Sequence, residues 1–144
     1  MTELELAYIA GLFDGEGCFG FNKMKTKRSS RGYIYVGRFS IVNTNLEVLN
    51  WVKLMLGTGS IYRRDRTKQG WKTCYELCWM ANQAKQILPQ LIPYLRIKKA
   101  QAELLYEYLC RRCHTGRGHP ISENEWGVRE GIVNRVRAIN KRGI

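Results

Sequence analysis

The sequence has no run that approaches the roughly 20 consecutive apolar residues of a membrane-spanning helix. Its first residues, MTELE, are acidic and have neither signal-peptide nor transit-peptide character. No stretch rich in proline, serine or glycine divides its 144 residues, which is the length of one domain. We therefore expect a single domain over residues 1–144 that acts inside the compartment where it is made, without a membrane partner.

Acidic residues are also scarce: the sequence has 12 Asp and Glu but 24 Lys and Arg, which gives a formal net charge of +12. Such an excess predicts a polyanionic partner, and nucleic acid is the expected one. An anionic membrane surface is the competing interpretation, but no basic amphipathic helix with a bulky apolar face stands apart from the rest. The five cysteines are an odd number in a chain without a secretion signal, which indicates reduced, mostly buried thiols.

Hydrophobic periodicity predicts one helix, then strand–strand–helix twice, then further helix. Residues 43–45 supply an N-cap and Gly57 a stop for the second helix, and Pro89 is expected to kink or split the third. This order indicates an α+β fold with two antiparallel hairpins, helices packed behind them, a core at about 3–114 and a C-terminal helical extension at about 115–144. The expected helices are 3–13, 46–56, 83–94, 98–113 and 123–141, and the expected strands are 18–27, 33–42, 59–66 and 71–80.

Alternation along the strands assigns one face of the sheet to the core and leaves the other open. The open face mixes Arg and Lys with Asn, Ser, Thr, Tyr and Glu, which are side chains that read base edges in the major groove. More basic residues gather at the hairpin ends, where phosphate contacts are expected; an ordinary polar sheet face is the alternative. The predicted core side carries Phe19, Phe21, Tyr35, Phe39, Ile41, Ile61, Tyr75, Leu77 and Trp79. The predicted DNA-binding residues are Asn22, Met24, Thr26, Arg38, Ser40, Tyr62, Arg64, Arg66, Lys72 and Glu76 on the open face and Lys27, Arg28, Arg31 and Lys68 at the hairpin ends.

Small residues recur along the first predicted helix. Ala7, Gly11 and Gly15 are four residues apart and share one face, which lets another helix approach closely. Asp14 and Glu16 come at the end of this helix, where partial negative charge disfavours carboxylates. Each would be tolerated if it capped the positive end of a neighbouring helix or held a cation; solvated loop residues are the alternative.

Residues 9–17, IAGLFDGEG, resemble the LAGLIDADG motif, with Glu in place of the second Asp. The following elements are similar in order to the αββαββα core of that family, and residues 56–59 and 94–102 resemble it as well. The resemblance covers most of the chain and implies a LAGLIDADG homing endonuclease, in which an antiparallel β-saddle sits on DNA. The single motif implies a C₂ homodimer on a pseudo-palindromic duplex. The implied interface residues are Ala7, Gly11, Asp14 and Gly15. Of these, Asp14 is expected to cap the partner's motif helix, with metal binding as the alternative.

The resemblance also implies the chemistry. Glu16 would be the metal-binding acid, the Gly15 carbonyl a further ligand, and Mg²⁺ the ion, because it suits hard oxygen ligands. Lys98 matches the family's active-site lysine, which organises solvent and stabilises transition-state charge, and Lys99 replaces it if the register shifts by one. Asn43 would orient water around the metal as the third catalytic residue.

These features predict a site-specific, Mg²⁺-dependent endonuclease that hydrolyses both strands of a long DNA site, leaves 3′ overhangs and promotes mobility of an intron or intein. It would act where its gene resides, in the cytoplasm of a prokaryote or inside an organelle that encodes it. Two alternatives stay open: an RNA-binding maturase with host intron RNA as its partner, and a non-cleaving DNA-binding regulator. The presence of Glu16 and Lys98 favours cleavage, since a pure binder needs neither.

Residues 110–114, CRRCH, match the attachment pattern of c-type haem. Haem attachment requires an export machinery that nothing in the sequence indicates. A zinc site that uses Cys110, Cys113, His114 or His119 fits the usual ligand spacing better. A complete set of four ligands is not evident, so zinc is a secondary hypothesis for this segment.

Overall fold

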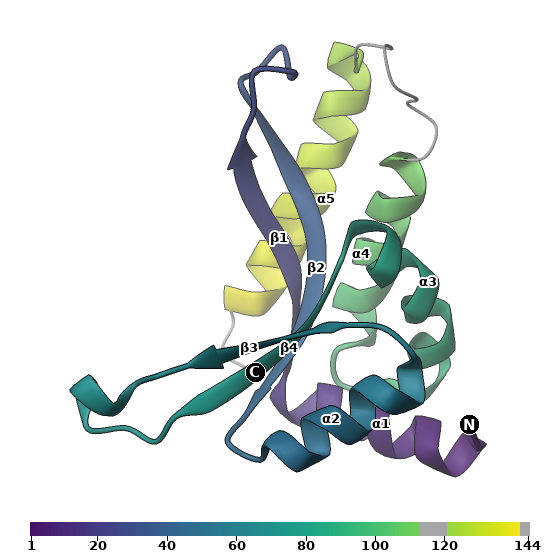
Figure 1. Ribbon diagram of the computed structural model, residues 1–144. Helices are drawn as coiled ribbons and strands as arrows, with labels where there is room; N and C mark the ends of the chain where they lie inside the picture. Colours follow the sequence, from purple (N-terminus) through teal and green to yellow (C-terminus); the bar gives the residue numbers. More distant parts are fainter. Residues whose placement is uncertain (113–120, 142–144) are drawn as a thin grey trace.

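The computed structural model describes residues 1–112 and 121–141 (Figure 1). The elements follow the predicted order, with two strand–strand–helix units between the first helix and the last two. None of the helices in these two ranges is long and apolar enough to cross a membrane. The helices are α1 (Glu3–Glu16), α2 (Leu46–Leu56), α3 (Ala81–Leu91), α4 (Lys99–Arg112) and α5 (Glu123–Lys141), with short 3₁₀ helices η1 (Thr67–Gln69) and η2 (Ile92–Tyr94). The strands are β1 (Gly17–Lys25), β2 (Tyr33–Asn43), β3 (Ser60–Arg64) and β4 (Cys74–Met80).

The four strands form one antiparallel sheet in the order β1-β2-β4-β3. Each hairpin pairs its own strands, and β2 pairs with β4 in the centre, where Phe39 lies opposite Trp79. The rings of these two residues stack with their centroids 4.9 Å apart, and Phe13 from α1 lies 5.4 Å from Phe39. The predicted α+β fold of antiparallel hairpins backed by helices is confirmed.

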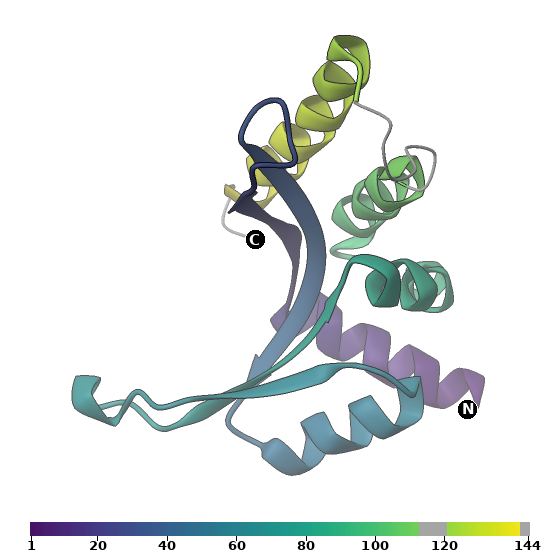
Figure 2. The ribbon, with the colours of Figure 1, turned by 45° about the horizontal axis from the view of Figure 1, so that its top comes forward.

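One face of the sheet is covered and the other is open. Figure 1 shows α1, α3 and α4 on one side of the twisted sheet, and the turned view of Figure 2 shows that no described helix covers its concave face. All nine residues predicted for the core side lie in the core or pack against it. α4 approaches β2 so closely that a Cβ at Gly37 would come within 2.7 Å of Leu105 Cδ1. The concave face is therefore the surface that the fold leaves available.

α1 starts with a capping box at residues 2–5 and runs beyond its predicted end at residue 13. It continues because the Gly17 amide still donates to the Phe13 carbonyl. Asp14 and Glu16 consequently stand within its last turn instead of after it.

The other boundaries depend on local capping and turns. α2 has the predicted bounds, since Asn45 caps its first turn and Gly57 ends it in the left-handed conformation. Pro89 does not split α3; it lies in the last turn, and the chain tightens into η2 directly afterwards. β4 begins at Cys74, later than predicted, because residues 66–71 fold into a compact turn.

α5, the predicted C-terminal extension, docks on the β1–β2 hairpin. Arg31 at the hairpin tip pairs with Glu123 at 2.7 Å and with Glu130 at 3.5 Å, and its guanidinium lies 5.1 Å from the centre of the Trp126 ring. Tyr33 donates to Glu130 at 2.6 Å, and this hydrogen bond raises the pKa of the phenol. Two carboxylates of its own chain therefore offset the charge of Arg31, and its phosphate contact stays a prediction.

The four described cysteines are free thiols, as predicted, but only Cys74 and Cys78 are buried, since Cys110 is half-buried and Cys18 is exposed. The other members of the predicted haem or zinc segment lie outside the described residues, and metal binding there stays a prediction. They are Cys113, His114 and His119.

Candidate active site

Reciprocal hydrogen bonds join the C-terminal end of α1 to the N-terminal end of α4. The Asp14 carboxylate accepts from the backbone amides of residues 96–98 at 2.9, 3.1 and 3.0 Å. In return, the Lys98 ammonium donates to the Gly17 carbonyl at the end of α1. Each charged side chain therefore faces a helix end of opposite partial charge. This explains why a carboxylate is tolerated in the last turn of α1.

Asp14 is thus a helix cap inside its own chain. The resemblance implies that it caps the partner's motif helix, which stays a prediction; within this chain, both of its oxygens accept from the amides that lead into α4. The sequence predicts a neighbouring positive helix end or a cation as the contact of Asp14. Which helix supplies that end depends on how α1 and α4 meet.

The three predicted catalytic residues come together at this junction. Asn43, the last residue of β2, donates from Nδ2 to Glu16 Oε2 at 2.6 Å. Lys98 reaches the same end of α1 through its bond to the Gly17 carbonyl. Lys99, the alternative for a shifted register, is exposed at the first position of α4. The geometry therefore favours Lys98.

A cavity of about 440 Å³ opens beside Glu16 and Asn43. Its far wall comes from the turn between β3 and β4, where Lys72 lies next to Trp71 and the Arg66 guanidinium is 5.6 Å from the centre of the indole. The cavity brings two predicted DNA contacts, Arg66 and Lys72, next to the candidate acid. Trp71 is 59% exposed, and sequence reasoning missed it; the available signal was a large aromatic residue close to a basic hairpin turn.

The donor atoms at the end of α1 fit a divalent cation that keeps much of its water. Glu16 is exposed, and only its Oε2 makes a hydrogen bond among the described residues. Gly15 lies in the last helical turn, where carbonyls have no intrahelical donor. No group of three or more His, Cys, Asp or Glu occurs within residues 1–112 and 121–141. One chain therefore offers a single carboxylate and main-chain oxygens, a set that suits Mg²⁺ better than an ion that needs a full protein cage.

The predicted small-residue face of α1 is open. Ala7, Gly11 and Gly15 are exposed, and a Cβ added at either glycine would have no described neighbour within 4 Å. Leu4 and Tyr8 lie beside them and are 83% and 55% exposed. A bare, largely apolar helix face of this kind fits close packing against another helix.

The strand residues predicted to contact bases share the concave face. The cross-strand register and the alternation place them opposite the core side chains. Their exposure differs, since Met24 and Tyr62 are 48% and 53% exposed whereas Ser40 is 5% exposed. Thr26, Arg66 and Lys72 lie in turns beyond the strand ends. The residues within strands are Asn22, Met24, Arg38, Ser40, Tyr62, Arg64 and Glu76.

Glu76 differs from the other members of this set. Its side chain is 10% exposed, and its two oxygens pair with Arg38 at 3.1 Å and with Arg64 at 3.0 Å. Arg38 also donates to Cys78 Sγ at 3.2 Å. Burial lowers the pKa of the Arg38 guanidinium, but the hydrogen bond to Cys78 and the charge of Glu76 raise it more. Arginines of its own chain therefore engage both carboxylate oxygens of Glu76, and its contact with a base stays a prediction.

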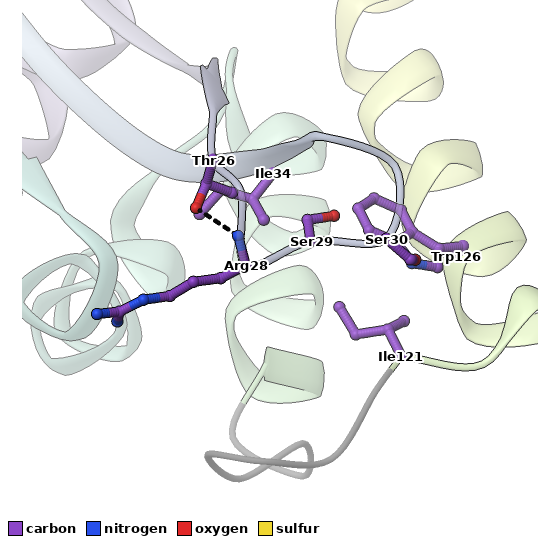
Figure 3. A pocket seen from close by; sticks show the side chains of 7 residues that line it. All are labelled: Thr26, Arg28, Ser29, Ser30, Ile34, Ile121 and Trp126. Atoms are coloured by element: carbon purple, nitrogen blue, oxygen red, sulfur yellow. Dashed lines mark hydrogen bonds between the residues drawn. The ribbon is translucent and has the colours of Figure 1, made fainter.

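A second cavity of about 440 Å³ lies at the tip of the β1–β2 hairpin, at the opposite end of β1 from Glu16. Figure 3 shows that it is lined by the hairpin, by Trp126 of α5 and by Ile121 before that helix, and that the Arg28 side chain extends to the side away from Trp126. The Arg28 amide donates to Thr26 Oγ1 at 3.3 Å. Lys27 and Arg28 at this tip and Lys68 at the other are exposed. They stay predicted phosphate contacts.

The family model described as LAGLIDADG endonuclease matches residues 9–110. That range is more than half of the chain and includes the IAGLFDGEG segment, the whole sheet and Lys98. The chain belongs to the LAGLIDADG endonuclease family. The membership predicted from residues 9–17 and from the element order is confirmed.

One relative in this family is the DNA endonuclease I-CvuI of Chlorella vulgaris. It is 28% identical to the chain over 112 residues, which are 74% of this chain and 65% of that protein. The chain thus matches slightly less than two thirds of the relative's length.

Solved structures of homing endonucleases share the fold. The chain matches I-CvuI in complex with its target, in the presence of calcium, with a TM-score of 0.79 and 19% identity over 94% of this chain and 82% of that one. It matches the archaeal intron-encoded I-Vdi141I complexed with DNA with a TM-score of 0.80 and 19% identity over 99% and 87%. The likeness therefore extends past residues 9–110 to the C-terminal part of this LAGLIDADG chain.

Proposed function

We propose that this protein is a site-specific endonuclease that cuts both strands of duplex DNA with a divalent metal ion. The observation that carries the proposal is the junction of Glu16, Asn43 and Lys98 at the end of α1, beside the open sheet face. The relative I-CvuI is named as a DNA endonuclease, and its structures with DNA include calcium in one case and magnesium in another. Mg²⁺ is the ion that we propose for this chain.

Each residue at the junction has a role in phosphodiester hydrolysis. A bound divalent ion supplies Lewis acidity and a more acidic water. Glu16 and the Gly15 carbonyl would hold that ion. Asn43 fixes the direction of the Glu16 carboxylate through its 2.6 Å hydrogen bond and can orient a water beside it. Lys98, anchored at the Gly17 carbonyl, offers a positive charge to offset the charge that develops on the phosphate.

The substrate assignment rests on charge and shape. The net charge of +12 favours a polyanion, and the concave face seen in Figure 2 is formed by a sheet whose strands can follow a groove. Exposed basic residues at the hairpin tips suit phosphates, which supply affinity and register. Arg66 and Lys72, in the Glu16 cavity, suit phosphates close to the cut.

We further propose that the active form is a C₂ homodimer that packs through α1. One chain offers one candidate acid, whereas cleavage of both strands needs one site for each strand. The open face at Ala7, Gly11 and Gly15 gives a second copy a surface on which to pack, and two-fold symmetry would match a pseudo-palindromic DNA site. The cut is proposed to leave 3′ overhangs and to serve intron or intein mobility, in the cytoplasm of a prokaryote or in an organelle.

The proposal is tested by cleavage of a library of random-sequence duplexes with Mg²⁺ and, in parallel, with EDTA. Wild type should cut one pseudo-palindromic sequence in both strands, and chelation should abolish the cut. Glu16→Gln should abolish cleavage, whereas the matched control Glu103→Gln, an exposed site on α4, should leave it intact. Lys98→Met should slow cleavage by about 100-fold or more, and the neighbouring Lys99→Met should not.

Other outcomes point to other functions. Cleavage retained in Glu16→Gln would move the chemistry away from this junction. Selective retention of one duplex without any cut would indicate a DNA-binding regulator. Selective binding of a structured RNA that does not depend on Mg²⁺ would indicate a maturase.

A further inference from the structure

A buried carboxylate lies in the middle of the concave sheet face. Glu76 on β4 has Val42 and Tyr62 as its cross-strand neighbours, and its side chain is 10% exposed. Arg38 reaches it from β2 at 3.1 Å and Arg64 from β3 at 3.0 Å. The result is an Arg–Glu–Arg bridge across three strands, on the surface that we propose to face DNA.

Neither DNA affinity nor stability accounts for this carboxylate. A negative charge on a DNA-binding face opposes the phosphates and lowers the local positive potential. A buried ion pair is also weak evidence for stability, because apolar residues of similar volume often replace one without loss. What the bridge does supply is direction, since it restrains two long side chains that are otherwise free to rotate.

The donors left over indicate a ligand rich in hydrogen-bond acceptors. Among the described residues, Glu76 and Cys78 engage only the Nη2 atoms of the two arginines. Arg38 Nε is buried and has no hydrogen-bond partner in the described part of the chain, so it does not face a ligand, whereas the Arg38 side chain as a whole is 22% exposed. The Arg64 side chain is 41% exposed. Guanine offers arginine two acceptors, O6 and N7, in the commonest specific contact between protein and base.

We propose that Glu76 is a positioning residue that holds the Arg38 and Arg64 guanidiniums ready to read guanine. The proposal rests on the DNA-binding function proposed above. Because one carboxylate binds both arginines, their guanidiniums lie within about two base-pair steps of each other, at about 3.4 Å a step. Base preference at one or two neighbouring positions of each half-site therefore depends on Glu76, although no base touches it.

The test is a base-by-base binding profile of purified protein. A duplex selected by wild type from a random-sequence library is varied at every position, and relative affinities are measured for wild type, Glu76→Gln and Arg64→Gln. Arg64→Gln should lose discrimination at its own position, by about 5- to 140-fold, which corresponds to one good bidentate contact. Glu76→Gln should lose discrimination there and at the neighbouring position that Arg38 reads. At the Arg64 position the double variant should be no worse than Arg64→Gln alone. Glu103→Gln removes the same charge from exposed α4 and should leave the profile unchanged.

Three results would overturn the proposal or its basis, and they are distinguishable. A Glu76→Gln profile that equals the wild-type or the Glu103→Gln profile shows that Glu76 does not position the arginines. Uniform weakening by Arg64→Gln, with a salt slope reduced by about 1, makes Arg64 a phosphate contact instead. A wild-type protein that selects no duplex defeats the proposed function itself.

Thermal melting of each variant separates specificity from folding. If Glu76→Gln does not fold, Arg64→Gln and Arg38→Gln decide the matter, because each must change base preference and the affected positions must be neighbours. Glu76→Asp keeps the charge on a shorter side chain and should restore part of the lost discrimination. An effect of misfolding alone would reduce binding to every sequence equally.

Discussion

Removal of the Asp14 carboxylate should destabilise the fold, because Asp14 holds the backbone that carries Lys98. Asp14→Ala deletes the acceptors of three backbone amides at residues 96–98, bonded at 2.9–3.1 Å. These amides lie in the turn that leads into α4, which begins at Lys99, so the variant leaves them without acceptors and removes a counter-charge from the positive end of the helix. The junction of α1 and α4 then keeps only the bond from Lys98 to the Gly17 carbonyl.

Two contributions set the expected decrease in the free energy of unfolding of Asp14→Ala. Loss of a helix cap costs about 1 to 2 kcal/mol of stability. Loss of a favourable charge at a helix end costs about a further 0.3–1 kcal/mol. We expect a decrease of about 2 kcal/mol in the free energy of unfolding for Asp14→Ala. At roughly 2–4 °C for each kcal/mol in chains of about this size, the melting temperature should fall by about 4–8 °C. Asp14→Asn keeps one acceptor oxygen and should lose about half as much.

The assay is urea and thermal denaturation at a fixed protein concentration, because dimer formation would make both midpoints depend on concentration. Glu16→Gln is the matched control: it changes an exposed carboxylate in the same helical turn that accepts one hydrogen bond, from Asn43. Its free energy of unfolding should stay within about 0.5 kcal/mol of wild type, while its cleavage activity disappears. Equal stability losses in Asp14→Ala and Glu16→Gln, or a loss below about 0.5 kcal/mol in Asp14→Ala, would refute the capping argument.

Two further predictions separate surfaces that look alike in sequence. Gly11→Leu should convert the proposed dimer to monomer in sedimentation analysis, because a large side chain would occupy the open α1 face. Gly127→Leu, at another helical glycine with no described neighbour within 4 Å of an added Cβ, should leave the proposed dimer intact. Arg31→Gln should lower the melting temperature through lost ion pairs and ring contact and leave the salt dependence of DNA binding unchanged. Arg28→Gln should leave stability unchanged and reduce the salt slope of DNA binding by about 1. A salt slope that falls for Arg31→Gln and not for Arg28→Gln would show that Arg31 contacts phosphate.

Local patterns in the sequence were sufficient for much of this protein. Alternation along the strands identified the core side of the sheet, because successive side chains point to opposite faces whatever the strand pairs with. Asn45 and Gly57 set the ends of α2 for the same kind of reason, since a cap satisfies backbone groups only a few residues away. The IAGLFDGEG segment indicated both the family and the candidate acid. The predicted end of α1 at residue 13 was too early, because the Gly17 amide still donates a helical hydrogen bond to the Phe13 carbonyl.

The tertiary structure decided the partners of the charged side chains. The sequence predicts contacts of Asp14, Arg31 and Glu76 with a partner chain or with DNA, and the structure shows that each also binds groups of its own chain. The physical reason is separation along the chain: Asp14 meets residues 96–98, and Arg31 meets the carboxylates of α5. Sequence determined which groups need a counter-charge, because that need is local to a helix end or a strand face. Only the packing of distant elements determined which group supplies it.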